Sequence, residues 1–328
     1  MVTDGGGGRR RRGSGRPTMR DVAQAADVSV AVVSYCFNHP DRVAAVTRER
    51  VLATARALGY EGANAAARAL RTGRTGVIGL ICPEERRSPL DDPCDLQVAR
   101  GVAHVAADAG LGLVLAPRGD ALVDGVVTLG DAVGRPGLPR VAVSDGPASD
   151  ADDCDRVSCD VAAGVAQGTS MLLEHGHRRF AVIGWVGDGA RRESALRTLA
   201  GSGATVNLME GESRRRGDGD LCARAALPPA AMPTAVIALS DEIAMSAMEV
   251  VASRGLRVPE DVSVMGVDDI PEAGLLGLTT VSVPYREKGE IAMGMLAALL
   301  RGDPVPKVPP LLSPFIPRRT TGPAPPLL

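Results

Sequence analysis

Aromatic side chains are scarce in this sequence of 328 residues: they make up 2%, with one Trp, three Tyr and three Phe. A ligand site built on stacked rings is therefore poorly supplied. Lysine is nearly absent as well, with two residues against 35 Arg, which indicates a coding preference and no function. The six Cys are scattered, without a CxxC pair or a His at ligand spacing, so neither a disulfide framework nor a zinc site is predicted. We expect no metal and no cofactor.

Long hydrophobic runs are also missing. The longest, such as Val77 to Cys82, fall well short of the roughly 20 residues that span a bilayer. The first residues lack the apolar stretch of a signal peptide, so we expect a cytoplasmic protein. No GxSxG, HExxH or Cys/His nucleophile pattern occurs, so no enzyme activity is expected.

Charge is distributed unevenly along the chain. The formal net charge is −2, but residues 1–75 carry +7 and the remainder carries −9. A small basic segment on a large acidic body is typical of a nucleic-acid-binding module joined to a second domain. Part of the positive charge lies in a Gly-rich run of arginines before residue 17, for which a disordered basic tail is expected.

Three short helices are predicted between residues 18 and 60. Thr18 precedes the first, and Ser29 is the expected N-cap of a second that runs to about Asn38. Thr47 is the expected cap of a third, which ends at Gly59. A tight turn separates the first two helices, as in the helix-turn-helix unit, whose second helix enters the DNA major groove.

The amino-acid sequence also contains specific motifs. Three motifs occur in order: RDVAQAADVSVAVVSYCFN (20–38), TRERVLATARALGY (47–60) and ARALRTGRTGVIGL (67–80). Two more follow: HGHRRFAVIG (175–184) and TAVIALSDEIAMSAMEVVASRGLRVPEDVSVMGVDDIP (234–271). With these motifs the chain resembles the lactose-repressor (LacI/GalR) family of bacterial transcription regulators over nearly its whole length.

The resemblance implies that the second helix reads bases. Val30, Ala31 and Tyr35 share one face at helical spacing and are the expected base readers, through contacts with thymine methyl groups and through the Tyr35 hydroxyl. A purely structural role for Val30 and Ala31 stays open. The further DNA-contact or capping positions are Thr18, Ser29, Ser34 and Asn38.

A hinge helix is implied by NAAARAL (64–70), which is too short to be stable alone in water. In the family this helix pairs with its dimer mate in the minor groove, where a leucine wedges between base pairs; Leu70 matches that leucine, and Asn64 and Arg68 are the accompanying DNA contacts. A plain linker with Leu70 packed against the body is the alternative.

Beyond residue 76, short apolar segments alternate with helical ones. The predicted strands are VIGLIC, GLVLA, GVVTL, RVAVS, FAVIG, AVIAL and VSVMGV. This alternation indicates parallel, doubly wound sheets, which bind ligands at the carboxyl ends of their strands. The expected fold is a small all-α helix-turn-helix domain plus an α/β two-lobed core like that of periplasmic binding proteins. The expected boundaries are a basic tail at 1–16, a DNA-binding domain at 17–62, a hinge at 63–75 and an effector-binding and dimerisation core at 76–328.

The resemblance also implies effector contacts in the cleft between the lobes. Arg192 matches the arginine that grips the effector, and Asp268 matches the aspartate that accepts hydrogen bonds from it. Asp160 and Asp241 match acidic positions near the cleft, and Trp185 follows a strand end where it could stack on a sugar. For these last three residues, loop capping or core packing is the alternative.

Several positions depart from the family pattern. Asp27 stands at a turn where the family usually has Gly, although Asp tolerates a left-handed backbone better than most residues. Cys94 and Asp95 stand where an aromatic residue is expected, after an apparent insertion of EERRSP type. The connections on either side of GVVTL are too short for the usual crossover helix. The N-terminal lobe is therefore predicted to lack one or two helices.

The sequence thus predicts a homodimeric repressor that binds a palindromic double-stranded DNA operator and responds to a small, sugar-like effector. Dimerisation follows because one short recognition helix supplies few base contacts. Two alternatives stay open: an effector-independent regulator with a degenerate cleft, and a cytoplasmic solute-binding protein.

Overall fold

The computed structural model describes residues 17–60, 73–83, 90–116, 122–130, 132, 136–146, 154–213 and 216–326. The chain divides into two units, Met1–Thr75 and Gly76–Leu328. We call the described residues 17–60 the head, and the described residues from 76 onward the body. The expected basic tail and the hinge residues Asn64, Arg68 and Leu70 lie outside the described ranges.

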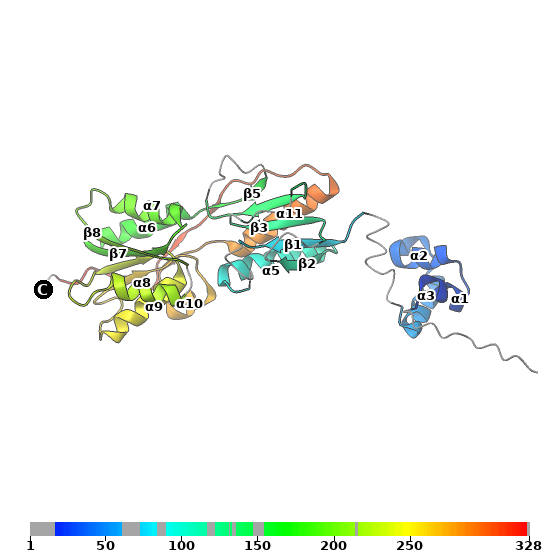
Figure 1. The fold of residues 1–328 in the computed structure, drawn as a ribbon, viewed down its shortest axis with the longest axis horizontal. Helices are drawn as coiled ribbons and strands as arrows, with labels where there is room; N and C mark the ends of the chain where they lie inside the picture. Colours follow the sequence, from blue (N-terminus) through cyan, green and yellow to red (C-terminus); the bar gives the residue numbers. More distant parts are fainter. Residues whose placement is uncertain are drawn as a thin grey trace, which may run out of the picture. The chain divides into compact units, whose positions relative to one another are not determined.

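Short helices make up the head (Figure 1). They are α1 (Met19–Ala25), α2 (Val30–Asn38), the 3-10 helix η1 (Pro40–Arg42) and α3 (Ala45–Leu58). Their apolar faces meet in a small core, with Val22, Val33 and Val51 fully buried. This core fixes which face of α2 is left to solvent.

The start of α3 differs from the prediction. The helix begins after Ala44, which makes no side-chain cap, so the expected cap at Thr47 is wrong and Thr47 lies in the first turn. The helix extends upstream because Ala45 is a strong helix former and nothing there breaks it. Its predicted end at Gly59 is confirmed: Gly59 has a φ of 71°, the left-handed conformation that closes helices.

The first lobe of the body is built on a parallel sheet with strand order β2-β1-β3-β4-β5. Its strands are β1 (Val77–Ile81), β2 (Gly112–Ala116), β3 (Gly125–Leu129), β4 (Arg140–Val143) and β5 (Asp155–Val157). Two helices, α5 (Pro93–Asp108) and α11 (Tyr285–Arg301), pack against each other and against this sheet. Gly101 and Gly289 allow their close approach, because a Cβ on either would collide with the backbone of the other helix.

Residues 117–121, 131 and 133–135 of this lobe are not described. The described residues between β2 and β3 and between β3 and β4 form no helix. Ile81 and Val126, on the face opposite α5 and α11, pack with Ala132, Val123 and Leu138 from these connections. Loop side chains thus contribute to the cover of the second face.

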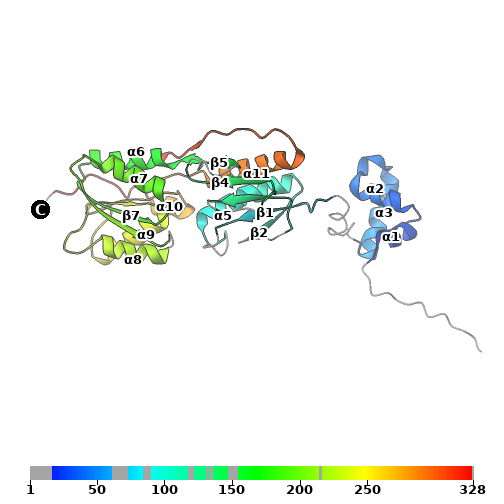
Figure 2. The ribbon, with the colours of Figure 1, turned by 45° about the horizontal axis from the view of Figure 1, so that its top comes forward.

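The second lobe has a parallel sheet of order β10-β9-β7-β8 between two helical layers. Its strands are β7 (Arg179–Trp185), β8 (Thr205–Gly211), β9 (Ala235–Ala238) and β10 (Ser263–Met265). Its helices are α6 (Val161–Glu174), α7 (Gly189–Leu199), α8 (Arg216–Ala226), α9 (Asp241–Ser253) and α10 (Pro271–Leu276). Helices α6 and α7 pack together on one side, and α8 and α9 on the other (Figure 2).

The chain passes between the lobes after β5, before α11 and after α11. Two short pairings anchor the returning segment to the second lobe. The parallel pair is β6 (Cys159–Asp160) with β12 (Leu311–Leu312), and the antiparallel pair is β11 (Thr280–Val281) with β13 (Phe315–Ile316). The body is therefore a two-lobed α/β structure of the expected class.

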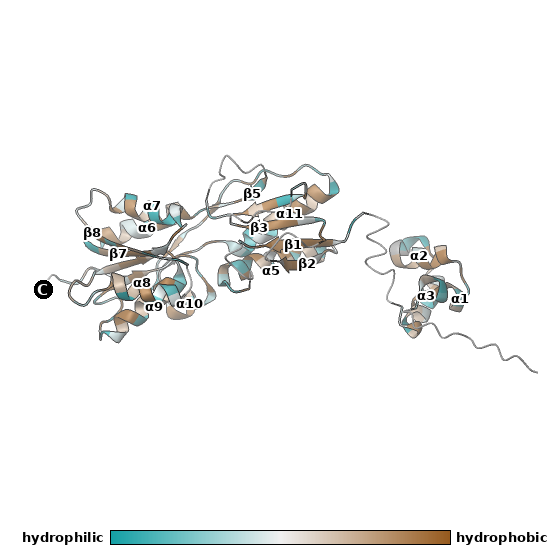
Figure 3. Ribbon diagram, viewed as in Figure 1, coloured by the Kyte–Doolittle hydropathy of each residue, from teal (hydrophilic) through white to brown (hydrophobic). Residues whose placement is uncertain are grey.

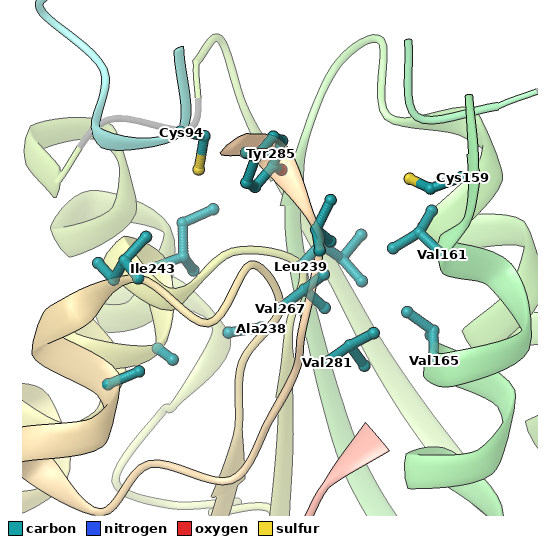
Figure 4. Packing of buried hydrophobic residues seen from close by; sticks show 14 of the residues in the cluster. Cys94, Cys159, Val161, Val165, Ala238, Leu239, Ile243, Val267, Val281 and Tyr285 are labelled. Atoms are coloured by element: carbon teal, nitrogen blue, oxygen red, sulfur yellow. The ribbon is translucent and has the colours of Figure 1, made fainter. Parts of the chain in front are cut away.

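Apolar residues concentrate on the central strands, and the helices show polar residues outward (Figure 3). One continuous cluster of buried side chains runs through both lobes. Tyr285 and Cys94 of the first lobe belong to the same cluster as Leu239 and Val267 of the second (Figure 4).

Candidate functional site

The exposed face of α2 is the first candidate site. Val33 is fully buried, whereas Val30 and Tyr35 are 42% and 43% exposed and Ala31 is also exposed. Leaving large apolar side chains in water is unfavourable, so a face of this kind is suited to a partner surface. The structure therefore leaves the three expected base readers accessible on one helix.

The hydroxyls of Thr18 and Ser29 cap helices of the head. Thr18 forms a capping box with Asp21: the Asp21 backbone N–H donates to Thr18 Oγ1, and the Thr18 N–H donates to the Asp21 carboxylate at 2.7 Å. The hydrogen bond from the Thr18 backbone also lowers the pKa of Asp21. Ser29 caps α2 by accepting from the N–H of Val32 at 3.3 Å. Ser34 is half-buried, and Asn38 is the last residue of α2, which the His39 backbone N–H closes by donating to the Tyr35 carbonyl.

The second candidate site lies where the two lobes meet, and it is centred on Arg191. This guanidinium is buried, and its Nη1 donates to the Asp268 carboxylate and to the Leu239 carbonyl, both at 2.8 Å. Its Nη2 donates to Asp145 at 2.5 Å and to the Tyr285 hydroxyl at 2.9 Å. A buried charge requires such paired, directional partners.

The arginine beside Asp268 is therefore Arg191, which corrects the prediction of Arg192. Arg192 points from the same helix to Glu210 on β8, with an Nη1–Oε1 distance of 2.5 Å. Neighbouring helical residues differ in direction by about 100°, so only one of the two guanidiniums can face the lobe junction. Sequence spacing alone could not decide which one.

Arg191 and the polar side chains that contact it form a second group, which we call the cluster from here on. Lys288 of α11 extends it. Its Nζ lies 2.6 Å from Asp145 Oδ1 and 3.7 Å from Cys159 Sγ. Asp145 follows β4 and thus bridges a cation of its own lobe, Lys288, and a cation of the other lobe, Arg191. Tyr285 completes the junction, since its hydroxyl donates to Asp268 at 2.6 Å.

Two aspartates of the second lobe have raised pKa values. Burial raises the pKa of Asp188 to about 6, against the opposing effect of Arg191. Burial and then the charge of Asp268 raise the pKa of Asp241 to about 8. Asp241 therefore holds a proton at neutral pH, because a second negative charge beside Asp268 in this buried place is unfavourable.

The other expected effector contacts have different positions. Asp241 is buried behind the junction, where it accepts from the Ile270 N–H at 3.0 Å and from the Thr280 hydroxyl at 2.6 Å. Asp160 is exposed and caps α6 by accepting from the N–H of Ala163 at 3.1 Å. In both cases the structure has the packing or capping arrangement that the sequence left open.

Trp185 ends β7 and is half-buried, with its ring 5.6 Å from the guanidinium carbon of Arg191. At this distance a cation and an indole ring attract each other. The indole thus contacts the cluster through Arg191. Cys94 and Asp95, which replace the expected aromatic residue, are buried at the start of α5.

Sequence reasoning missed Asp145, Asp188, Arg191, Tyr285 and Lys288. Two signals were available. Asp145 and Asp188 each follow a strand at its carboxyl end, where ligand sites of parallel sheets form. Lys288 is one of only two lysines in a chain rich in arginine, and this rarity was a reason to consider it as a candidate site residue.

A cavity of about 420 Å³ adjoins the cluster. It is lined by Gln97, Asp268, Asp269, Ile270, Pro271, Val283, Pro284, Tyr285, Arg286, Glu287 and Glu290. Its volume falls in the range of small-molecule sites. Asp268 and Tyr285 belong to both the cavity and the cluster, so a ligand in the cavity would reach the cluster directly.

Among the described residues, no group of His, Cys, Asp and Glu side chains is arranged to hold a metal ion. No helix in the same ranges is both long and apolar enough to cross a membrane.

Comparison with known proteins adds independent information. Residues 18–62 match the bacterial regulatory proteins of the lacI family, and residues 169–321 match the periplasmic binding protein-like domain. An HTH-type transcriptional regulator of Mycobacterium tuberculosis is 31% identical, over 94% of this chain and 98% of the relative.

Solved structures give the same picture. A complex of the transcriptional regulator CelR with cellobiose is 26% identical, with a TM-score of 0.63 over 93% of this chain and 100% of that one. A lac repressor dimer bound to operator and an anti-inducer has a TM-score of 0.77 at 22% identity, over 94% of this chain and 100% of that one. The fold of the whole chain is thus that of these regulators.

Proposed function

This chain belongs to the lacI family of bacterial regulatory proteins, and from that premise we propose that it is a homodimeric repressor that binds a palindromic operator under the control of a small molecule. We further propose that it works in the cytoplasm and acts by binding, without catalysing a reaction. The proposed division of labour is a basic tail at 1–16, a DNA-binding domain at 17–62, a hinge at 63–75 and an effector-binding core at 76–328.

The exposed face of α2 is the single observation that carries the DNA-binding proposal. Val30, Ala31 and Tyr35 project from a helix whose opposite side is fixed by the core of the head. Apolar contacts discriminate thymine through its methyl group, and the phenolic hydroxyl adds one directional contact. Ser29 caps α2, Ser34 and Asn38 are residues of α2, and all three are proposed to contact phosphates, as is Thr18 at the start of α1.

Exposed leucines support the dimer. Leu221 of α8 and Leu275 and Leu276 of α10 are exposed. Apolar side chains grouped on a surface favour a protein partner. A second copy of the chain is the partner that a palindromic operator requires.

The lobe junction is the proposed effector site. An effector that changes how the lobes meet would alter operator affinity, and the operator would alter effector affinity by the same factor. One observation favours a second candidate, an effector-independent repressor: the carboxylates of Asp145, Asp188 and Asp268 all lie within ion-pair distance of Arg191.

In vitro selection of random duplex DNA by the full-length protein, at near-physiological salt, tests the proposal. We expect one palindrome and a complex that contains two protein chains, measured by light scattering. A Val30→Ala and Tyr35→Ala double variant should fold but select no such sequence. Enrichment of unrelated sequences by both proteins would contradict sequence-specific recognition.

A further inference from the structure

We infer that the lobe junction is a site for an anionic ligand, one bearing a carboxylate or phosphate group, which takes the place of the Asp145 carboxylate between Arg191 and Lys288. This inference rests on the proposed function, because it names the chemical class of the effector. Asp145 then acts as an internal substitute for the ligand anion.

Two cations converge on one carboxylate at this place. Arg191 Nη2 contacts Asp145 Oδ2 at 2.5 Å, and Lys288 Nζ contacts Asp145 Oδ1 at 2.6 Å. Each oxygen therefore receives its own charged donor, an arrangement that suits any group with two equivalent anionic oxygens. Tyr285 adds a neutral hydroxyl beside Arg191 Nη2, at 2.9 Å.

Asp145 is the accessible member of the cluster. Its side chain is 32% exposed, whereas the side chains of Arg191 and Lys288 are each 1% exposed. Asp268 differs, because it is buried and its backbone is held by hydrogen bonds to the backbones of Val281 and Val283. A ligand arriving from solvent thus meets Asp145 first.

The charges favour an anion over a neutral sugar. If Asp145 were withdrawn, Arg191 would keep Asp268 and Asp188 as partners. Lys288 would keep the Cys159 thiol at 3.7 Å and the Tyr285 ring at 5.1 Å. Neither neutralises a buried ammonium group, and an uncompensated buried charge is strongly destabilising. Displacement of Asp145 is therefore favourable only when another anion replaces it.

Replacement of Asp145 would also affect the contact between the lobes. Asp145 belongs to the lobe of β4, and Arg191 belongs to the lobe of β7. Their ion pair is a direct bridge that a ligand would exchange for a bridge through itself. The same event that binds the anion thus changes the junction on which regulation depends.

Trp185 provides an internal probe, since it is the only tryptophan and its ring lies 5.6 Å from the Arg191 guanidinium carbon. The experiment titrates the full-length protein with sodium phosphate and follows Trp185 emission. Sodium chloride at equal ionic strength and glucose serve as comparison solutes. We expect a saturable change with phosphate and no saturable change with chloride or glucose.

Three variants sharpen the test. Asp145→Asn removes the internal competitor and should bind phosphate about ten-fold more tightly, which corresponds to about 1.4 kcal/mol. Lys288→Gln should weaken phosphate binding by a similar factor. Arg197→Gln is the matched control, because Arg197 is an exposed residue of α7 whose ion pair with Glu193 lies outside the cluster.

Equal phosphate affinity in the wild type, Asp145→Asn and Lys288→Gln would overturn the inference, as would saturation by glucose instead of phosphate. Thermal unfolding establishes that each variant is folded. If Asp145→Asn does not fold, the wild type and Lys288→Gln decide the question. Operator binding, measured without phosphate, tests the proposed function separately: intact operator binding with no phosphate response refutes the anion site alone.

Discussion

Arg191 and Arg192 are adjacent in α7, yet the first is buried against Asp268 and the second lies nearer the surface against Glu210. The buried guanidinium holds together charges from both lobes, whereas the other joins a helix to an edge strand of one lobe. The two residues therefore differ in what their removal would leave behind.

Replacing these arginines should have very different effects on stability. Arg191→Met leaves Asp268 and Asp188 without their cation, and breaking a buried pair costs about 3–5 kcal/mol. Arg192→Met removes a partly exposed pair worth about 0–1 kcal/mol. Urea unfolding followed by circular dichroism measures both. Similar losses in the two variants would contradict the placement of Arg191.

The turn of the head stores backbone strain at one residue. Asp27 has a φ of 49°, the left-handed region that disfavours residues with a Cβ. Asp27→Gly should stabilise the head by up to about 1 kcal/mol, and Asp27→Ala should destabilise it. Chemical denaturation of the full chain, followed through the head transition, gives both values. Stabilisation by Ala would refute the strain argument.

Stability should depend on pH through Asp241. Its pKa of about 8 in the folded protein lies above the usual value of 3.8, so the folded state binds more protons than the unfolded state between those pH values. The contribution of Asp241 is therefore most favourable below pH 4 and is lost as pH rises towards 8. Asp241→Asn should remove this decline, because an amide does not ionise in this pH range, while it can still pair with Ile270 and Thr280.

Asp188 offers an internal comparison for that experiment. Its pKa of about 6 predicts a decline that ends near pH 6, two units earlier than for Asp241. The quantity to plot is the difference in free energy of unfolding between wild type and each Asn variant, from pH 4 to 9. Curves that level off at the same pH would show that the two carboxyls are not held in different environments.

Operator preference should change when the exposed face of α2 is altered. Tyr35→Phe removes one hydroxyl and Val30→Ala removes methyl contacts, and each base-specific contact is worth about 1–3 kcal/mol of discrimination. Both side chains are exposed, so the melting temperature should stay unchanged. Competition between the selected operator and single-base variants measures the effect. A uniform loss on all sequences would assign these residues to phosphate contacts.

The hinge prediction rests on the sequence. Leu70→Ala should weaken operator binding by about ten-fold or more, because an apolar wedge between base pairs supports the DNA bend that brings further contacts. The unfolding transition of the body should not move. Unchanged operator affinity would refute the wedge and favour a plain linker.

Much of the fold was predictable because its signals are local. All seven strands expected from short apolar runs are present, as are the caps at Thr18 and Ser29. Among the strands that were not predicted, β8 is an edge strand whose first four residues are exposed, so it lacks the continuous apolar run of a buried parallel strand. The absence of described helices between β2, β3 and β4 was anticipated from connection length alone.

The functional sites, too, were predictable from the sequence only in part. The sequence by itself determined the family, the helix-turn-helix pattern and which residues form the exposed face of α2, because caps, turns and helical faces depend on neighbours within one or two turns. Only the tertiary structure decided that Arg191 faces Asp268, that burial raises the pKa of Asp241 behind them, and that Asp145 joins Arg191 to Lys288. Those facts depend on the rotation of α7 and on groups far apart in the chain that meet where the two lobes close, and no local pattern of residues encodes that meeting.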